Sequence, residues 1–241
     1  MTGGDAEVLT DDEGPIRVIT LNRPARLNAF TADGYRLLAH SLRDADDAPG
    51  VHVVLIQGAG RAFSSGVDLD AFRSGDHGAF ASGFGELLDV LLGLRKPLVA
   101  AVHGPAVGFG ATLLLHCDVV LVADDARLRF PFTKLGTAPE AGSSWLLPAT
   151  VGAQRAAELL LTSRWVSSAE AVELGLAARV VPAAELAARS RDVAHQMAAH
   201  PLPAVVAAKR LLKMSARTAV PVAIGHESEA GRSLAEELGG L

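Results

Sequence analysis

The chain lacks the groups from which disulfides, metal centres and nucleic-acid-binding surfaces are usually built. It contains one cysteine, Cys117, so no disulfide can form within the chain, and we expect a buried thiol in a reducing compartment. No cysteines and histidines cluster at the spacing of metal ligands. The formal net charge is −5, so a basic surface for nucleic acid would have to be local. We therefore expect neither a metal nor a nucleic-acid partner.

The nearly uncharged stretch of residues 98–123 is long enough for a membrane helix, but its sequence argues against one. Gly104-Pro105 breaks the stretch, and Asp118 and two histidines interrupt it. Buried strands and a buried helix are predicted instead. The first residues, Met1 to Glu7, have neither the basic flank nor the apolar core of a secretory signal. We expect no membrane partner and a cytoplasmic location.

Strands and helices are predicted to alternate along most of the chain. Its 241 residues are 49% hydrophobic and 20% charged, which suffices for the core of one ordinary domain. Predicted strands cover residues 7–10, 16–21, 51–57, 98–102 and 118–123. Predicted helices cover residues 31–48, 86–94, 109–116, 153–161, 168–174, 183–199, 204–215 and a segment from about 220. This alternation predicts an α/β fold with a largely buried sheet, the last helices packing on the core or on a neighbouring subunit.

Two segments carry more specific expectations. Thr31 is predicted to cap a helix that buries Leu37, Leu38 and Leu42 on one face. Residues 74–85 hold many glycines and serines and little apolar content, so they are predicted to form a mobile loop. Such a loop could be a substrate lid or an ordinary surface loop.

Two glycine-bearing turns, each between a predicted strand and a helical pattern, carry the main functional signal. The first spans residues 61–69 around Gly66, and the second spans residues 104–112. Small residues allow close backbone approach, and the first turn of a helix leaves N–H groups without partners. Two such turns side by side could aim two N–H donors at one oxygen and stabilise an enolate. Taken singly, each turn is also typical of ordinary α/β proteins, without dinucleotide-binding or P-loop spacing.

Glu140 is the acidic group near these turns. It lies in an otherwise apolar stretch bounded by glycine and proline, residues 129–144. A carboxylate in such surroundings could have a raised pKa and act as a base. Alternatively, Glu140 is a first-turn acid favoured by the dipole of the following helix. The residues alone leave both interpretations open.

An ordered set of motifs resembles the crotonase superfamily of enoyl-CoA hydratases and isomerases. The motifs are Leu21-Asn22-Arg23-Pro24 with Asn28-Ala29-Phe30, Ala62 to Leu69, Gly104-x3-Gly108-x-Gly110, Cys117-Asp118, Ala156 to Thr162 and Ala169 to Leu176. The resemblance implies a ClpP-like spiral of ββα units over residues 1–182, which holds an acyl-CoA site. It also implies a C-terminal helical trimerisation region over residues 183–241, and a homotrimer or dimer of trimers.

The resemblance also assigns roles to single residues. It implies that the backbone N–H groups of Val67 and Phe109 hold the thioester oxygen of an acyl-CoA, with Glu140 as the catalytic acid and base. Phe109 replaces the glycine usual in the family, so its side chain is expected to point away from the thioester. Coenzyme A is part of the substrate, so no cofactor is expected. The implied substrate-binding positions are Arg26, Ser65, Gly66, Asp68, Leu69, Gly108 and Gly110.

Several of the polar residues also have plain structural interpretations. Asp68 is favoured as a helix N-cap, and Arg26, placed by the resemblance near the coenzyme A adenine, could be a solvated surface arginine. Lys209 and Lys213 share a helix face and could reach a phosphate of coenzyme A or only solubilise the helix. His116 is expected to be a satisfied core histidine.

The pattern of acids favours isomerisation over hydration. In this chain the two glutamates of family hydratases are replaced by Thr112 and Phe132, neither of which can transfer a proton from a carboxyl group. Residues 138–144, around Glu140, are similar to a motif of peroxisomal-type Δ3,Δ2-enoyl-CoA isomerases that contains their single base. We therefore predict an enzyme of fatty-acid β-oxidation that shifts a 3-enoyl-CoA to a trans-2-enoyl-CoA. The alternatives are an enoyl-CoA hydratase or other crotonase-type lyase or hydrolase, and a non-catalytic paralogue that binds acyl-CoA or a partner protein.

Overall fold

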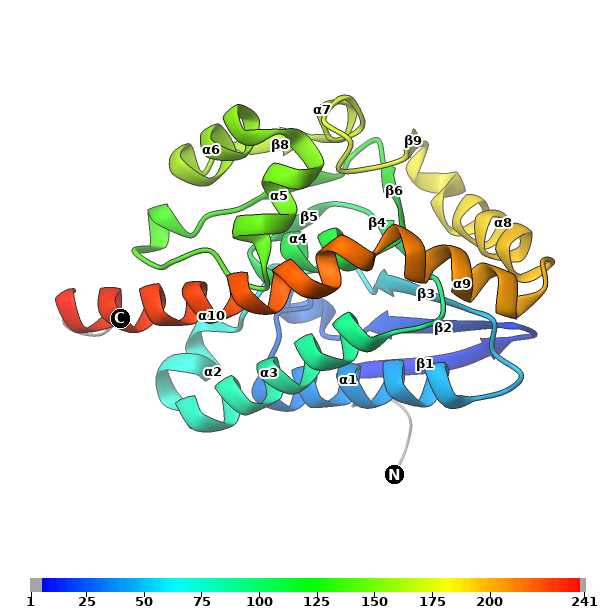
Figure 1. Cartoon of the computed structure of the whole chain (residues 1–241), viewed down its shortest axis with the longest axis horizontal. Coiled ribbons are helices and arrows are strands. Elements are labelled where there is room, and N and C mark those ends of the chain that lie inside the picture. Colours follow the sequence, from blue (N-terminus) through cyan, green and yellow to red (C-terminus); the bar gives the residue numbers. More distant parts are fainter. Residues whose placement is uncertain (1–5, 239–241) are drawn as a thin grey trace.

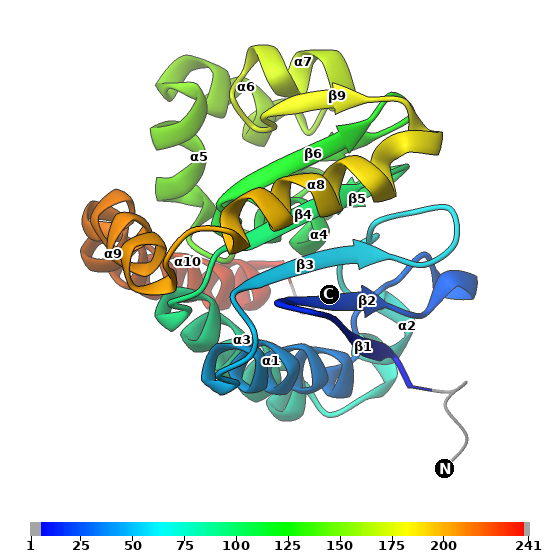
Figure 2. The same ribbon diagram turned by 90° about the vertical axis from the view of Figure 1, so that its right-hand side faces the viewer.

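The computed structural model describes residues 6–238, which form a layered α/β structure around a six-stranded sheet (Figure 1). In Figure 2 the strands follow one another in the order β1-β2-β3-β4-β6-β9. The hairpin of β1 and β2 is antiparallel, and the other neighbouring pairs are parallel. The strands are β1 Val8–Glu13, β2 Ile16–Leu21, β3 Val53–Gly58, β4 Leu98–Val102, β6 Val119–Ala123 and β9 Arg179–Val181.

A second, three-stranded sheet continues the strands of the first. It consists of β5 Pro105–Val107, β7 Arg127–Arg129 and β8 Trp165–Ser167. Strand β5 follows β4 directly and leads into α4 Phe109–Thr112. Strand β7 follows β6 directly and leads into the 3-10 turn Thr133–Leu135. This succession of two strands and a helix is the predicted ββα spiral, so the predicted fold class is confirmed.

Helices cover both faces of the main sheet. In Figure 2, α8 lies across one face, and α1 and α3 lie together beyond the β1 edge. Buried residues of α1 and α3 join the hydrophobic cluster on the other face of the sheet. The remaining helices are α1 Ala32–Asp47, α2 Leu69–Ser74, α3 His77–Gly93, α5 Ser143–Val151, α6 Ala153–Thr162, α7 Ser168–Glu173, α8 Leu186–Ala198, α9 Leu202–Leu212 and α10 Met214–Glu237. Short 3-10 turns occupy Pro24–Arg26, Leu113–His116, Thr133–Leu135 and Ala183–Glu185. None of the helices described has the length and apolarity that crossing a membrane requires. Met1–Asp5, part of the segment examined for a secretory signal, lie outside the described residues.

The apolar run of β4 is buried because both of its faces are covered. Val99 and Ala101 point into the cluster under α8, and Leu98, Ala100 and Val102 point into the larger cluster on the other face. Successive side chains of a strand alternate between faces, so a strand covered on both sides needs apolar residues throughout. The sequence prediction of a buried strand is confirmed here.

Helix α1 begins where its capping residue was predicted. The Thr31 hydroxyl oxygen accepts a hydrogen bond from the Gly34 N–H at 2.9 Å, and Leu38 and Leu42 are fully buried. Leu37 is 38% exposed, so the prediction that it shares the buried face is wrong. A residue adjacent to a buried one is rotated by about 100° around the helix, whereas residues four apart lie on one face.

The predicted mobile loop at residues 74–85 is mostly helical, which corrects both loop interpretations. Asp76 caps α3 by accepting hydrogen bonds from the N–H groups of Gly78 and Ala79. Gly83 faces α1, where a Cβ atom would lie 2.8 Å from the Ala32 carbonyl oxygen. At this position glycine therefore allows two helices to pack closely. The composition suggested mobility because a single sequence does not reveal this packing.

Lys209 and Lys213 do not form the solvated face that the sequence suggested. The Lys209 ammonium is buried, 2.7 Å from an Asp118 carboxylate oxygen, and donates to the Lys96 carbonyl oxygen. Lys213 donates to the carbonyl oxygens of His116 and Cys117. Both lysines therefore fasten the C-terminal helices to the start of β6. Because Lys209 is buried, it neither solubilises the helix nor is available to contact a phosphate of coenzyme A.

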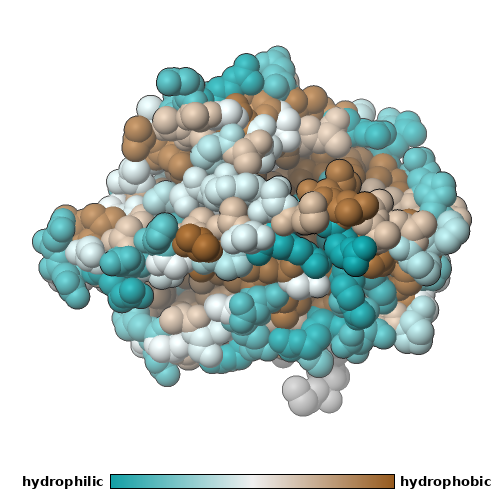
Figure 3. Space-filling model, in the orientation of Figure 1, coloured by the Kyte–Doolittle hydropathy of each residue, from teal (hydrophilic) through white to brown (hydrophobic). Residues whose placement is uncertain are grey.

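Apolar side chains gather on the surface where α9 meets α10. Figure 3 shows hydrophobic atoms over this junction, and Leu211, Leu212 and Met214 are 63%, 82% and 64% exposed. Exposed apolar residues grouped in this way mark interaction surfaces more often than scattered ones do.

We predict that Lys209→Met destabilises the protein by about 3 kcal/mol, because removing the nearer partner of a buried pair leaves the Asp118 charge with only Lys213, 3.8 Å away, as a counter-ion. Burial lowers the pKa of Lys209 and the Asp118 carboxylate opposes that shift, so the pair is held in a poorly solvated place. Denaturant unfolding measures the change. The exposed Lys134→Met is the control and should change stability by less than about 0.5 kcal/mol. Equal unfolding free energies for the two variants would contradict the prediction.

Candidate active site

The two glycine turns lie against each other at the carboxyl ends of β3 and β4. The Val107 N–H donates to the Ser64 carbonyl oxygen at 2.9 Å, and the Ser64 N–H donates to the Pro105 carbonyl oxygen at 3.2 Å. A Cβ atom on Gly66 would lie 3.3 Å from the Phe109 nitrogen. The structure therefore brings together the two turns that were singled out far apart in the sequence.

The backbone N–H groups of Val67 and Phe109 donate no hydrogen bond among the described residues. A parallel bridge between Phe30 and Val67 uses neighbouring groups instead. The Phe30 N–H donates to the Gly66 carbonyl oxygen, and the Asp68 N–H donates to the Phe30 carbonyl oxygen. Phe109 is the first residue of α4, where an N–H has no partner within the helix. Two neighbouring segments thus each present one unpaired backbone donor.

Glycine is required at these turns because their backbones are so close that a side chain would not fit or because the φ angle is positive. Gly66 has φ +88° and Gly108 has φ +55°, conformations that other residues rarely adopt. A Cβ atom on Gly110 would collide with the Ser64 carbonyl oxygen. Each of these glycines therefore serves the contact between the turns.

The side chain of Phe109 lies in an aromatic cluster beneath the turns. It is 1% exposed, and its ring centroid is 5.2–5.3 Å from those of Phe30, Tyr35 and Phe84. The edge-to-face geometry of these pairs is the one that aromatic rings prefer. The side chain of Phe109 is thus buried in the core, while its backbone N–H remains at the turn.

Glu140 is partly buried and close enough to Tyr35 for its charge to act on the Tyr35 hydroxyl. Burial raises the pKa of Glu140 to about 7, and the charge of Glu227 adds to the effect. Burial also raises the pKa of Tyr35, with the Glu140 charge as the second cause. The residue after Glu140 lies beside the segment that follows the second turn, because the Ala141 carbonyl oxygen is 2.8 Å from His116 Nε2.

The loop carrying Glu140 is held by groups from other elements. His116 has its pKa lowered to about 4 by burial, so its ring is neutral at neutral pH, and Nε2 lies 2.8 Å from the Ala141 carbonyl oxygen. Since a carbonyl only accepts, Nε2 carries the proton. His116 is therefore the satisfied core histidine that the sequence predicted. Glu227 contacts the same loop and was missed, because nothing in a single sequence separates it from the exposed acids of the same helix.

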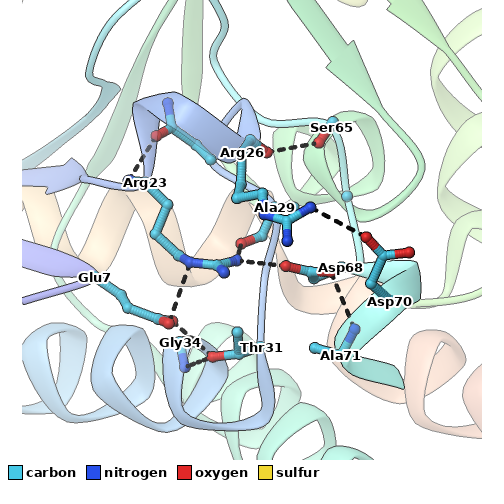
Figure 4. Close-up of polar contacts among 12 residues, drawn as sticks. Glu7, Arg23, Arg26, Ala29, Thr31, Gly34, Ser65, Asp68, Asp70 and Ala71 are labelled. Atoms are coloured by element: carbon cyan, nitrogen blue, oxygen red, sulfur yellow. Dashed lines mark hydrogen bonds and ion pairs between the residues drawn. The ribbon is translucent and has the colours of Figure 1, made fainter. Parts of the chain in front are cut away.

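Of the remaining predicted substrate-binding residues, Arg26, Ser65 and Asp68 lie close together at the first turn (Figure 4). Arg26 is exposed and pairs with Asp70 at 3.1 Å, and the Ser65 hydroxyl donates to the Arg26 carbonyl oxygen at 3.4 Å. Leu69 is 41% exposed at the start of α2. Arg26, Ser65 and Leu69 thus form an accessible rim around the turn.

Asp68 is a structural cap, as favoured from the sequence. One carboxylate oxygen accepts from the Ala71 N–H at 3.1 Å, and the other accepts from the Arg23 guanidinium at 3.0 Å (Figure 4). Burial opposes its ionisation, but these two donors outweigh burial and lower the pKa of Asp68. Arg23 also pairs with Glu7 and donates to the Ala29 carbonyl oxygen, so the network ties the first turn to the hairpin.

The sequence resemblance places Thr112 and Phe132 at the positions of the two glutamates of family hydratases, and both side chains are buried. Thr112 is fully buried, with its hydroxyl 3.4 Å from the Phe109 carbonyl oxygen, and Phe132 is 3% exposed in the core. The described residues also contain no group of three or more potential side-chain ligands arranged to hold a metal ion.

Comparison with known proteins identifies the family of this chain. The family model described as enoyl-CoA hydratase/isomerase matches residues 11–237. The chain belongs to the enoyl-CoA hydratase/isomerase family. Its members share the crotonase fold, and the motifs quoted from the sequence lie in the matched range.

Relatives in the enoyl-CoA hydratase/isomerase family carry different names. A probable enoyl-CoA hydratase of Mycobacterium leprae is 33% identical over 91% of this chain and 86% of its own. The 1,2-epoxyphenylacetyl-CoA isomerase of Escherichia coli is 36% identical over 80% of this chain and 77% of its own. The crystal structure of an enoyl-CoA hydratase/isomerase from Pseudoalteromonas atlantica superposes with a TM-score of 0.90 at 33% identity, covering 95% of this chain and 92% of that one. The family and fold are therefore shared across proteins named for different reactions.

We predict opposite effects on stability for alanine at two glycines. Gly66→Ala should destabilise the fold by more than about 1 kcal/mol, because the new Cβ would lie 2.7 Å from the Val107 carbonyl oxygen at a φ of +88°. Gly85→Ala, in α3 with nothing within 4 Å of the new atom, should stabilise by about 0.5–1 kcal/mol. Thermal unfolding compares the two. A stabilised Gly66→Ala would mean that the turns are not in contact.

Proposed function

We propose that this family member converts a 3-enoyl-CoA into a trans-2-enoyl-CoA, with Glu140 as the single acid and base. Glu140 takes a proton from C2, the dienolate forms on the thioester, and the protonated carboxyl returns the proton at C4. Efficient transfer in both directions needs a pKa near the working pH. The observation that carries the proposal is the contact of two turns that each present an unpaired N–H group, at Val67 and Phe109. The raised pKa of Glu140, about 7 because of burial, suits the proposed proton transfer.

In this proposal the backbone amides of Val67 and Phe109 stabilise the dienolate. Both N–H groups are unpaired among residues 6–238, and they lie on turns in direct contact. Donors fixed before the reaction stabilise developing negative charge without reorganising. The absence of carboxylates at Thr112 and Phe132 supports isomerisation, since water addition would lack the two acids that it uses in family hydratases.

The substrate-binding roles also belong to the proposal. The accessible rim at Arg26, Ser65 and Leu69 supports binding of the coenzyme A portion there, while the glycines at 66, 108 and 110 and the Asp68 cap shape the turns. Coenzyme A enters as part of the substrate, and no separate cofactor takes part. We also propose a homotrimer or dimer of trimers, supported by the apolar surface at Leu211, Leu212 and Met214.

Hydration of an enoyl-CoA is the second candidate, and the names of relatives support it. Several relatives are named probable enoyl-CoA hydratases, including one from Rhizobium meliloti that is 35% identical. In this chain hydration would have to use Glu140 with an ordered water. Loss of the enoyl absorbance of crotonyl-CoA would reveal it, whereas the proposed isomerase forms an enoyl product from 3-hexenoyl-CoA.

We predict that Glu140→Gln lowers kcat with 3-hexenoyl-CoA by about 10²–10⁴, the usual loss on removing a general base. In the unsubstituted enzyme kcat/KM should rise with pH through a midpoint near 7, because only the ionised carboxylate can take the C2 proton. Steady-state rates across pH 5 to 9 measure both effects. Unchanged turnover in Glu140→Gln would remove Glu140 from the mechanism, and absence of turnover in both proteins would favour a binding-only paralogue.

The same substitution should stabilise the protein at high pH. A carboxyl whose pKa is raised from 4.5 to about 7 in the folded state costs stability progressively as pH rises through that range. Glu140→Gln should therefore exceed the unsubstituted protein in stability above pH 7 by up to about 3 kcal/mol, at 1.36 kcal/mol per pKa unit. The difference should close below pH 4.5. Denaturant unfolding at several pH values measures it, and a difference independent of pH would contradict the raised pKa.

A further inference from the structure

We propose that Glu227 is a positioning residue for Glu140: its carboxylate reaches from the C-terminal helix, grips the backbone that carries the base and places a second negative charge beside it. This inference rests on the proposed role of Glu140. It assigns to α10 a direct part in the site.

The contacts of Glu227 are specific and use both carboxylate oxygens. One oxygen accepts from the Gly142 N–H at 2.7 Å, and the other accepts from the Ser144 N–H at 2.8 Å. The side chain is 7% exposed, although its helix is largely solvated. Two N–H donors on a single carboxylate suit its ionised form. Glu227 therefore brings a buried charge to the loop that begins at Glu140.

The loop has a conformation that needs such support. Ala141 has φ +60° and Gly142 has φ +73°, so two successive residues lie in the left-handed region, one of them with a Cβ atom. Residues held in this region cost free energy and persist where the surroundings fix them. The surroundings here are Glu227 on one side and His116, which holds the Ala141 carbonyl oxygen, on the other. Helix α10 also packs Val220 directly against Gly142.

The charges around Glu140 come from several elements, and Glu227 is the one that acts on it directly. Tyr35 faces it from α1 as a neutral phenol, and His116 adjoins the loop as a neutral imidazole. The positive charge of Lys213, at the end of α9, helps to lower the pKa of His116. A like charge at short range disfavours ionisation of Glu140. The Glu227 charge therefore adds to burial in keeping the proton on Glu140 up to near-neutral pH.

A double-mutant cycle tests the inference without relying on turnover. The stability gained through Glu140→Gln is measured from pH 4 to pH 9 in the unsubstituted background and in the Glu227→Gln background. Glutamine can still accept from one N–H but carries no charge. We expect the midpoint of the pH-dependent gain to move down by about one pH unit in the Glu227→Gln background. The matched control is Glu229→Gln, which removes an exposed charge from the same helix and should leave the midpoint in place.

Activity supplies the second readout. The acid limb of kcat/KM with 3-hexenoyl-CoA should shift down by the same amount in Glu227→Gln, and Glu227→Asp, which keeps the charge, should hold it near its original position. A stability loss with no change in either midpoint would reduce Glu227 to a cap of α5 and overturn the inference. A shifted stability midpoint in a protein without isomerase turnover would overturn the proposed function and support the role of Glu227. Should Glu227→Gln not fold, Glu227→Asp in the same cycle must retain the midpoint, and its loss would count against the inference.

Discussion

The candidate site depends on the close approach of two backbone turns. Because β3 and β4 are parallel neighbours, the segments that follow them leave the sheet at the same edge. They can touch only if side chains are absent, and a Cβ atom on Gly66 or Gly110 would meet the carbonyl oxygens of Val107 or Ser64. Contact at this spacing places two segments with unpaired N–H groups side by side. The aromatic cluster around Phe109 then fills the volume below, so the turns rest on a packed base.

The third component of the site comes from a loop that does not hold its own shape. Glu140 precedes two residues with positive φ, and the contacts that stabilise them come from His116 and Glu227. The ion pair of Lys209 with Asp118 fastens the preceding helix, α9, to the sheet, and this fixes where α10 begins. The C-terminal helices thus contribute to the site through position and charge, in addition to any part they play between subunits.

The sequence predicted local structure correctly where a single residue determines that structure by itself. Thr31 marks a helix start through its own hydroxyl, and the glycine turns identify backbone that must approach something closely. The predictions failed where the partner lies far along the chain. Residues 74–85 look mobile until α1 is placed against Gly83, and Lys209 looks solvated until Asp118 is placed beside it. Helix α5 was missed because it contains Pro148, and proline inside a segment argues against a helix.

In the proposed function, the number and placement of proton carriers, more than the donors that hold the oxygen, separate isomerisation from hydration. An enolate needs the same two N–H groups whether water is added or a double bond moves, so the turns at Val67 and Phe109 suit either reaction. Water addition requires protons to be handled on the water and on the carbon. A double-bond shift needs one carboxyl group that returns the proton it has taken. Such a group works best when neither the protonated carboxyl nor the carboxylate is strongly favoured at the working pH. Burial of Glu140 disfavours the carboxylate and the nearby charge of Glu227 disfavours it further, so the raised pKa of about 7 suits the proposed role of a single proton carrier.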